Sequence, residues 1–412
     1  MWGFLYLFFI ANTMNLKFHI ALLPFSVLLF ALNSCQNTTR TDTGPSAKPK
    51  DTLAHMEPSD FKYHKLSDEY VALKQKQIAH FSKKTWNENA NVSFLVAKNG
   101  QIIFEKYQGY ANKQKSTCID YNTPLHIASV SKVITATAIL ELIDAKKITL
   151  DQKVNTILKE FPYSDITVQT LLNHRSGLRN YAYFTEDKGV WDRKKILTNA
   201  DLLRLLGEKK IELQSLPDRR FAYCNTNYAI LALIIEKVTG LTFADAMKRM
   251  IFDPLGMEDS YVYDYYSDNK KSVPSYKGNN VEIGRDYLDA VYGDKNIYST
   301  ARDLLKFDLA RNDPDFLSPA LQDKIYKGYS NERKGTKNYG LGLRMINWEN
   351  GKNFYFHNGW WHGNTSAYIT LKDENVVIIA LSNKFNRSTY KVRNLAPIFG
   401  DYPFKIEKEE LE

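Results

Sequence analysis

The stretch Ser129-Val130-Ser131-Lys132 decides the fold, because it begins a segment, 128–144, with the hydrophobic pattern of a helix. Apolar residues recur there at helical spacing, at Val130, Val133, Ile134, Ala138 and Leu142. Residues three apart share one face of a helix, so Ser129 and Lys132 are expected side by side. The free N–H groups at a helix start also favour a developing negative charge on a serine placed there.

The pairing of Ser129 with Lys132 indicates a chemical role for the two residues. A serine hydroxyl is a weak nucleophile and needs an adjacent base. A lysine one helical turn away can serve if burial and its neighbours lower its pKa. The spacing alone is weak evidence, since Ser267–Lys270 and Ser388–Lys391 repeat it. Only Ser129 begins an apolar helix behind a strand hairpin, so Ser129 is the candidate nucleophile and Lys132 its candidate base.

The rest of the segment 65–405 has strand patterns at both ends and mainly helical patterns between them. Strands are predicted at 92–97, 102–107, 342–348, 353–357, 366–371 and 376–381, with a hairpin turn at Lys98-Asn99-Gly100. Helices are predicted at 68–82, 228–239, 243–252 and 389–399, with a loop at 211–220. This order predicts an α+β fold, in which helices flank an antiparallel sheet built from both ends and a mainly helical region is inserted.

A second group of polar residues, Tyr223-Cys224-Asn225, is predicted to lie in a loop just before the helix from Tyr228. A tyrosine there can relay a proton to a leaving group when a cation lowers its pKa. An asparagine can hold a substrate amide. The pattern is weak by itself, because the chain has 26 tyrosines.

A third group, His357-Asn358-Gly359, is predicted to close the strand at 353–357. A glycine at that point lets a substrate lie against the strand edge. The N–H of the following Trp360 would then form an oxyanion hole with the N–H of Ser129. A lone histidine is more often structural, so this triplet counts only together with the other two groups.

In this order and rough spacing the three groups resemble those of the serine β-lactamase and penicillin-binding-protein family, in particular class C β-lactamases, D,D-peptidases and related esterases. In that family the second motif is Y-x-N and the third is K-T-G or H-x-G. Four further stretches resemble family segments: Thr167–Leu178, Phe252–Met257, Ser299–Leu304 and Tyr339–Gly342. The resemblance runs from about Val92 to Asn383 and implies a β-lactamase/transpeptidase-like fold.

The resemblance also implies roles. Ser129 would be acylated, with Lys132 and Tyr223 sharing proton transfer. The substrate-binding residues would be Asn225, His357, Gly359 and Trp360. The implied reaction is acyl transfer through a covalent acyl-enzyme, on a small-molecule or peptide substrate with an ester or amide bond, without a metal or organic cofactor. The alternative is a non-catalytic cell-envelope protein that binds peptidoglycan-like or peptide ligands on the same fold.

Some residues depart from the family pattern. His357 replaces a lysine, and an unperturbed histidine is mostly neutral at pH 7. The site would thus lose a permanent positive charge, which weakens the expectation of β-lactam hydrolysis. Trp360 and Trp361 stand where small residues are usual and are expected to crowd the site, favouring a small or flat acyl group. His174, Ser176 and Asp303, in the matching segments, are interpreted as structural.

The N-terminus has two apolar stretches, Trp2–Ile10 and Ile20–Leu32, each too short for a confident membrane-spanning helix. The second ends in Leu32-Asn33-Ser34-Cys35, which resembles a bacterial lipobox. We predict a signal peptide at 1–34, starting at Met1 or Met14, with lipidation of Cys35. An uncleaved signal anchor through both stretches is the alternative. Either way the protein is expected to be exported and attached to a membrane.

The polar segment 35–64 is predicted to be a lipid-anchored tether, 65–405 the hydrolase domain and 406–412 a tail. The lipoprotein would lie in a bacterial cell envelope, in the periplasm or on the outer surface. The net charge of +9 is spread over short lysine runs, which indicates a solvated basic surface and no nucleic-acid partner. Cys118 and Cys224 have no metal-type spacing and are expected to be unpaired thiols, unless the fold brings them together.

Overall fold

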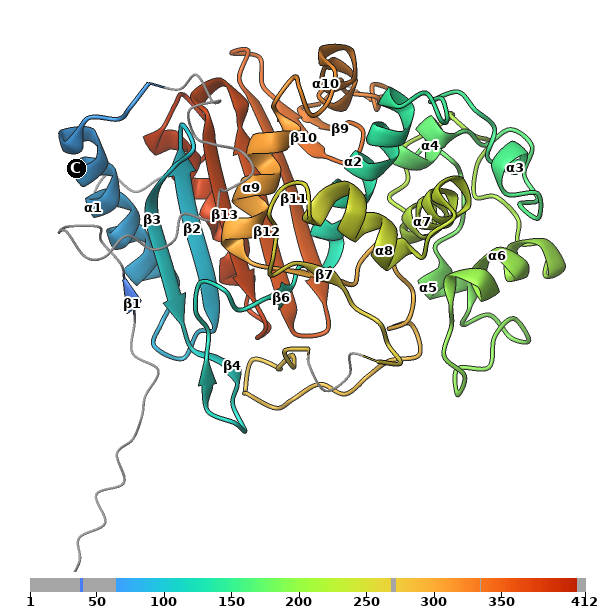
Figure 1. Ribbon diagram of the computed structural model, residues 1–412, viewed down its shortest axis with the longest axis horizontal. Coiled ribbons are helices and arrows are strands. Elements are labelled where there is room, and N and C mark those ends of the chain that lie inside the picture. Colours follow the sequence, from blue (N-terminus) through green and yellow to red (C-terminus); the bar gives the residue numbers. More distant parts are fainter. Residues whose placement is uncertain (1–37, 40–63, 268–271, 334, 406–412) are drawn as a thin grey trace, which may run out of the picture. The chain divides into compact units, whose positions relative to one another are not determined.

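The computed structural model describes residues 38–39, 64–267, 272–333 and 335–405, all within the unit Cys35–Glu412. The frame of this unit is an eight-stranded antiparallel sheet (Figure 1). Its strand order is β1-β3-β2-β13-β12-β11-β10-β9. The strands are β1 (Thr38–Thr39), β2 (Val92–Lys98), β3 (Gln101–Gln108), β9 (Lys337–Tyr339), β10 (Arg344–Asn347), β11 (Asn353–Trp361), β12 (Asn364–Leu371) and β13 (Val376–Ser382).

The predicted hairpin and the predicted joining of the two chain ends are both confirmed. Asn99 and Gly100 have φ angles of 51° and 73°, the left-handed values that a two-residue hairpin turn requires. β13 pairs with β2, with Val377 opposite Ala97. The prediction for β11 was too short, because this strand continues four residues beyond His357 to Trp361. The short edge strands β1 and β9 were not predicted.

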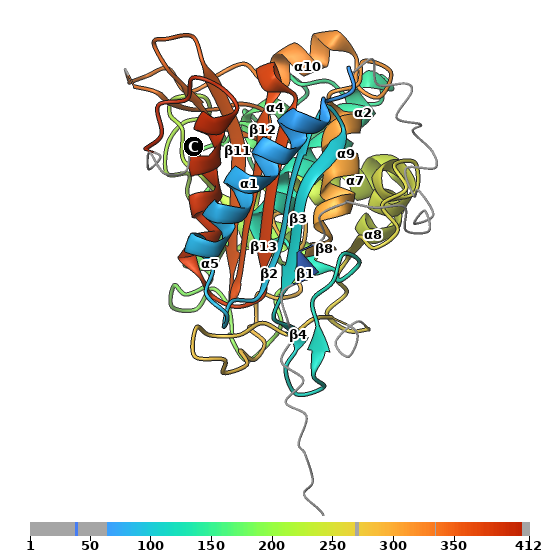
Figure 2. The ribbon, with the colours of Figure 1, turned by 90° about the vertical axis from the view of Figure 1, so that its left-hand side faces the viewer.

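One face of the sheet is covered by α1 (Asp68–Thr85) and the 3-10 segment η5 (Arg387–Ile398), which lie side by side (Figure 2). The side chain of Ser67 caps α1 by accepting a hydrogen bond from the N–H of Tyr70 at 3.2 Å. Helices were predicted at both places. The last one is of the tighter 3-10 type, and it contains Pro397, which has no N–H to donate.

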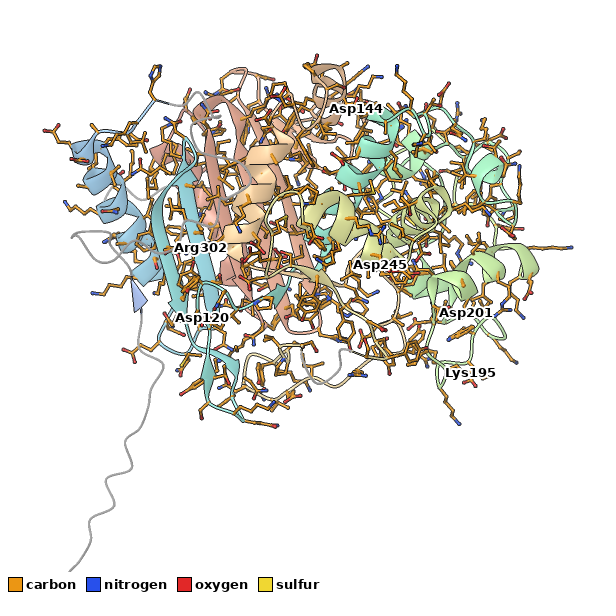
Figure 3. The ribbon with its side chains drawn as sticks, in the orientation of Figure 1. Asp120, Asp144, Lys195, Asp201, Asp245 and Arg302 are labelled. Atoms are coloured by element: carbon orange, nitrogen blue, oxygen red, sulfur yellow. The ribbon has the colours of Figure 1, made fainter. Side chains whose placement is uncertain are left out.

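The other face packs on α9 (Ala301–Arg311) and on the inserted region, which is mainly helical as predicted (Figure 1). The inserted helices are α2 (Ser131–Asp144), α3 (Val154–Ile157), α4 (Val168–Leu172), α5 (Tyr181–Phe184), α6 (Asn199–Glu208), α7 (Asn225–Thr239), α8 (Phe243–Met247) and the π-helical turn η2 (Lys248–Phe252). α10 (Pro319–Ile325) follows α9. Asp201 and Asp245 lie in the first turns of α6 and α8, where a negative charge complements the helix dipole (Figure 3).

Smaller elements complete the unit. A three-stranded sheet has the order β6 (Leu125–His126), β8 (Ile297–Ser299), β7 (Tyr261–Val262). The strands β4 (Tyr110–Asn112) and β5 (Thr117–Cys118) form a hairpin. The 3-10 turns are η1 (Ala128–Val130) and η4 (Lys372–Glu374). Because β6 runs directly into η1 and α2, the small sheet fixes the start of the central helix.

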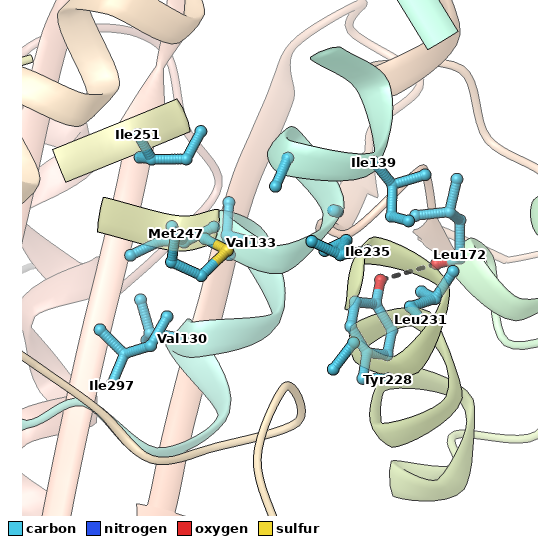
Figure 4. Packing of buried hydrophobic residues seen from close by; sticks show 14 of the residues in the cluster. Val130, Val133, Ile139, Leu172, Tyr228, Leu231, Ile235, Met247, Ile251 and Ile297 are labelled. Carbon is cyan, nitrogen blue, oxygen red and sulfur yellow. Dashed lines mark hydrogen bonds between the residues drawn. The ribbon is translucent and has the colours of Figure 1, made fainter. Parts of the chain in front are cut away.

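Helix α2 lies at the centre of the packing and is buried on nearly all sides. Eleven of its 14 residues are buried. It packs against α7 and η2, and Val133 lies among the apolar side chains of the core (Figure 4). The hydroxyl of Tyr228 on α7 donates a hydrogen bond to the carbonyl of Leu172 at 2.8 Å (Figure 4). A helix this enclosed can hold a side chain away from bulk water.

The structure bears on the predictions made for the cysteines and for the N-terminal segment. Cys224 is a free, buried thiol, whereas Cys118 is disulfide-bonded, so the prediction of two unpaired thiols is wrong for Cys118. Cys35, the predicted signal peptide, most of the predicted tether and the tail 406–412 lie outside the described residues. In the part of the chain that the structure describes, no helix has the length and apolarity needed to cross a membrane.

Candidate active site

A strained turn carries Ser129. Ala128 has a φ angle of +48°, in the left-handed region that residues with a side chain rarely adopt. Its N–H donates a hydrogen bond to Nδ1 of the buried His126 at 3.1 Å. The first turn of the predicted helix is therefore the 3-10 turn η1, and α2 begins at Ser131. This backbone places Ser129 at the start of a helix.

The predicted neighbours Ser129 and Lys132 are in contact. Nζ of Lys132 donates hydrogen bonds to Oγ of Ser129 at 3.0 Å and to the carbonyl oxygen of Asp294 at 2.7 Å. Lys132 is fully buried. The lysine thus lies within proton-transfer distance of the serine hydroxyl, which itself is half-buried.

Tyr223 and Asn225 come to the same place. Nζ of Lys132 lies 5.2 Å from the centre of the Tyr223 ring. Asn225 is the first residue of α7 instead of part of a loop, because the helix begins three residues earlier than predicted. Its Oδ1 is buried and has no hydrogen-bond partner among the described residues. A buried amide oxygen without a partner is costly, so it is suited to a ligand donor.

His174 packs against the segment that contains Tyr223. Its Nδ1 accepts a hydrogen bond from the N–H of Cys224 at 3.2 Å, and its ring lies 4.4 Å from that of Tyr223. Burial, followed by the charges of Lys132 and Arg344, holds the pKa of His174 well below its usual range. A neutral ring packed in this way matches the structural interpretation. Ser176 likewise lies inside, where its hydroxyl donates to Asn227 at 2.7 Å.

His357 is buried on β11 and is uncharged. Burial, then the positive charges of Arg344 and Lys132, hold its pKa well below the usual range. Nδ1 lies 2.9 Å from the carbonyl of Asn358, which can only accept, so Nδ1 carries the proton. Nε2 is left to accept from the hydroxyl of Tyr339 at 3.3 Å. His357 therefore orients its neighbours without contributing a charge.

Arg344 is a residue that the sequence analysis missed. It lies on β10, and its guanidinium is 4.5 Å from the centre of the Tyr223 ring. β10 pairs with β11, with Arg344 opposite Phe356, and the Arg344 charge is one of those that lower the pKa of His357. The sequence signal that could have identified Arg344 is its position, as a basic residue in the strand that precedes the strand of the H-x-G motif. The permanent charge that His357 lacks is thus present on the neighbouring strand.

Gly359 is the point at which β11 meets the turn of Ser129. A Cβ added to this glycine would lie 2.5 Å from the carbonyl oxygen of Ile127 and 3.0 Å from Cβ of Ala128. The hydroxyl of Ser366 on β12 also donates to the Ile127 carbonyl, at 2.6 Å. The segments that carry the Ser129 and Trp360 N–H groups are therefore in direct contact, as an oxyanion hole requires.

The two tryptophans after Gly359 point to opposite faces of the sheet. The Trp360 side chain is 63% exposed and packs near Phe385, with 6.3 Å between ring centres. The Trp361 ring lies on the face of His357 and Gly359, 4.8 Å from Nζ of Lys295. The expectation that both would crowd the site is wrong for the side chain of Trp360, because strand alternation turns it away.

A second buried lysine, Lys295, was also missed. Its Nζ donates to the hydroxyl of Tyr181 at 2.8 Å, and that hydroxyl donates to Oδ2 of Asp294 at 2.9 Å. Burial, with a smaller contribution from Lys132, lowers the pKa of Lys295, while Asp294 opposes the shift. Asp294 therefore serves both lysines, through its backbone carbonyl for Lys132 and its side chain for Lys295. No periodicity in the sequence marks this arrangement.

Comparison with known proteins agrees with this geometry. The profile of the Beta-lactamase family matches residues 81–398. The chain belongs to the Beta-lactamase family. It is 31% identical over 320 residues to penicillin-binding protein 4* of Bacillus subtilis, covering 73% of this chain and 70% of that protein. It is 28% identical over 323 residues to a D-aminopeptidase of Brucella anthropi, covering 73% and 58%.

Solved structures confirm the predicted fold. A penicillin-binding protein from Bacillus halodurans superposes with a TM-score of 0.66 at 22% identity, covering 81% of this chain and all of that one. The β-lactamase/transpeptidase-like α+β fold is therefore established. Relatives in the family are serine hydrolases, so the chain belongs to a group of β-lactamase-related serine hydrolases.

The contact at Gly359 predicts the effect of a single methyl group. Gly359→Ala should lower the free energy of unfolding by about 1–3 kcal/mol, because the added Cβ must displace the Ser129 turn or Ser366. Urea unfolding measures this loss. Gly335→Ala is the control, since a Cβ there meets nothing within 4 Å. Equal stability of both variants would contradict the close approach of β11 to the turn.

The buried His126 predicts a pH dependence of stability. Burial lowers its pKa to about 4, below the ordinary 6.5 expected in the unfolded chain. The unfolded state alone therefore binds this proton as the pH falls from 6.5 to 4, and the free energy of unfolding should drop by about 3 kcal/mol over that window.

Unfolding of His126→Gln by urea across this pH range tests the assignment. The variant should show a shallower fall in stability than the wild type, because it lacks the titrating ring. The exposed His80→Gln is the matched control and should keep the wild-type slope. Identical slopes for wild type and His126→Gln would show that this ring does not titrate as described.

Proposed function

We propose that this chain hydrolyses an amide or ester by acyl transfer, with Ser129 as nucleophile and Lys132 as base. The observation that carries the proposal is the 3.0 Å contact between Nζ of the fully buried Lys132 and Oγ of the half-buried Ser129. A binding protein has no need of a buried lysine aimed at a serine hydroxyl. Burying an amino group away from water is costly, so its presence favours chemistry.

In the proposed reaction Lys132, in its neutral form, accepts the proton of the Ser129 hydroxyl while Oγ attacks the substrate carbonyl carbon. The oxyanion of the tetrahedral intermediate is held by the N–H groups of Ser129 and Trp360. The proton passes by way of Tyr223 to the leaving group, the bond to the leaving group breaks, and an acyl-enzyme remains. Water then attacks the ester carbonyl, releasing the acid and restoring the proton to Ser129.

The charge distribution indicates where the leaving group lies. Tyr223, the proposed proton relay, must contact the leaving atom, and the guanidinium of Arg344 stacks on the same ring. A leaving group with a carboxylate would therefore meet Arg344, a permanent cation, in place of the lysine that His357 replaces. The missing lysine thus does not leave the proposed site without a positive charge.

For the substrate class we propose amides or esters whose acyl part is a D-amino acid residue. The support is the similarity to the D-aminopeptidase of Brucella anthropi. A panel of 4-nitroanilides of D- and L-alanine, a D-Ala-D-Ala peptide and nitrocefin separates the possibilities. Faster turnover of the D-alanyl than of the L-alanyl compound is expected. A preference for the L-alanyl compound would contradict the proposed class.

Covalent labelling tests the nucleophile. A fluorophosphonate probe should form one adduct that peptide mass mapping places on Ser129, and Ser129→Ala should lower turnover by about 10⁴-fold or more. Ser388→Ala is the matched control, because Ser388 and Lys391 have the same spacing. Equal labelling of the wild type and Ser129→Ala would overturn the enzymatic proposal, and no labelling at all would favour the non-catalytic alternative.

We also propose that the protein is exported and anchored through a lipid on Cys35, on the strength of the lipobox-like Leu32–Cys35. Intact-mass measurement of protein from membranes, without reduction, should show a chain that begins at Cys35 and carries a diacylglyceryl thioether. One sulfur atom cannot be both a thioether and part of a disulfide, and with Cys224 free, Cys35 is the one other cysteine of this sequence that could pair with the disulfide-bonded Cys118. The proposed lipid anchor therefore requires that Cys118 has no disulfide to Cys35 in the mature protein. Detection of Cys35 as a free thiol or in a disulfide would therefore contradict the lipid anchor.

A further inference from the structure

A buried ion pair adjoins Lys132 and has no part in the reaction proposed above. Lys295 and Asp294 are only 2% and 1% exposed, and Nζ of Lys295 lies 3.8 Å from Oδ1 of Asp294. Removing two charges from water costs about as much as their attraction returns, so a buried pair adds little net stability. The presence of this pair beside the proposed base therefore needs an explanation other than stability.

The hydrogen bonds indicate where the protons of the pair lie. Nζ of Lys295 is surrounded by three accepting oxygens: the Tyr181 hydroxyl at 2.8 Å, the Val291 carbonyl at 2.9 Å and Oδ1 of Asp294. The Tyr181 hydroxyl donates its own proton to Oδ2 of Asp294. Burial and then Asp294 hold the pKa of Tyr181 well above its usual range, so the hydroxyl keeps that proton. Three acceptors suit an ammonium group, which makes Lys295 the cation and Asp294 the anion of the pair.

The pair is connected to Lys132 through a single residue. The backbone carbonyl of Asp294 accepts from Nζ of Lys132, while the carboxylate of the same residue belongs to the ion pair. Thr135, one residue short of a full turn beyond Lys132 on α2, donates to the carbonyl of Gly293 at 2.8 Å. An added Cβ at Gly293 would lie 2.5 Å from the carbonyl oxygen of Tyr228 on α7. This segment is thus fixed between α2 and α7, and its charges keep a fixed position beside Lys132.

The two charges of the pair act on Lys132 in opposite directions. The Asp294 carboxylate favours a protonated Lys132, which cannot accept the proton of Ser129. The Lys295 ammonium favours the neutral form that the reaction requires. This repulsion is mutual, and the charge of Lys132 is accordingly one of the causes that lower the pKa of Lys295, after burial. Solvent screens such interactions least in the interior, where both amino groups lie.

The other titratable groups near Lys132 come from the end of α4, the start of α7 and the sheet: His174, His357, Tyr223, Tyr228, Cys224 and Arg344. Burial is the main reason that both histidines are neutral, and it raises the pKa of the thiol to about 11 and the pKa of Tyr228 above its usual range. Arg344 adds a permanent positive charge. Around Lys295 the further groups are the carboxylates of Asp289 and Asp286 and the neutral His126. None of these groups changes when the ion pair is altered.

From this geometry we propose that Lys295 is a positioning residue that holds Lys132 in its neutral, proton-accepting form by compensating the charge of Asp294. The inference rests on the proposed acyl transfer at Ser129 and names the group that tunes the base of that reaction. Lys295 acts through Asp294 and Lys132 and takes no part in proton transfer itself.

The rate at which a fluorophosphonate labels Ser129, measured from about pH 5 to about pH 10, tests this role. In that step the bond from Oγ to phosphorus forms, the phosphorus–fluorine bond breaks, fluoride leaves and Lys132 takes the serine proton. The probe carries no group that titrates in this range, so the fall in rate on the acid side reports protonation within the protein.

The two members of the pair should have opposite effects. Lys295→Met leaves the Asp294 carboxylate uncompensated, so the acid limb should move to higher pH by about one pH unit, with labelling about tenfold slower near neutral pH and recovering in alkali. Asp294→Asn leaves the Lys295 charge uncompensated, so the acid limb should move to lower pH. The double variant has neither charge and should return close to the wild-type profile.

Asp308→Asn is the matched control, because it removes a buried carboxylate from the ion pair with Arg311 on α9. This variant should lose stability in urea and keep the wild-type pH profile. If Lys295→Met fails to fold, the folded Asp294→Asn decides alone through the direction of its shift.

Three results would overturn the inference: shifts of both single variants in the same direction, a uniform loss of rate at every pH, or an unchanged profile in folded variants. Each of these would leave the proposed function standing as long as the wild type is labelled on Ser129. Absence of a Ser129 adduct and of turnover in the wild type would instead reject the proposed function, and the role of Lys295 with it.

Discussion

Lys132 places an amino group in the middle of the molecule, and the surrounding structure depends on how that group is accommodated. Its Nζ contacts two oxygen atoms, Ser129 Oγ and the Asp294 carbonyl, and lies near the rings of Tyr223 and Tyr228. Its hydrogen bonds offset part of the cost of removing this polar group from water. The enclosed helix α2 holds the lysine in this position.

Two histidines near Lys132 carry no charge. His174 and His357 are both neutral, primarily because they are buried and in part because Lys132 lies near them. Neutral histidines can pack tightly under Tyr223 and beside Tyr339 without adding to the positive charge. Arg344 lies at the side, stacked on the Tyr223 ring. The candidate site thus combines a dry interior around Lys132 with one cation placed for a ligand.

Much of this could be predicted from sequence, because it depends on local patterns. The hairpin turn at Asn99 and Gly100, the helix that contains Lys132 and the late strands all have signals within a few residues. Contacts between distant segments have no such signal. Arg344, Lys295 and Asp294 reach the site only through strand order and loop packing, and the Trp360 side chain turns away because β11 continues past His357.

The central claim is that the turn of Ser129 docks on β11 so that one substrate carbonyl meets both the nucleophile and two N–H groups. A crystal structure of the acyl adduct tests it most directly. The account predicts the acyl carbon bonded to Ser129 Oγ, with its carbonyl oxygen about 2.7–3.1 Å from the backbone nitrogens of Ser129 and Trp360. An adduct on another residue, or a carbonyl oxygen directed away from β11, would contradict the account.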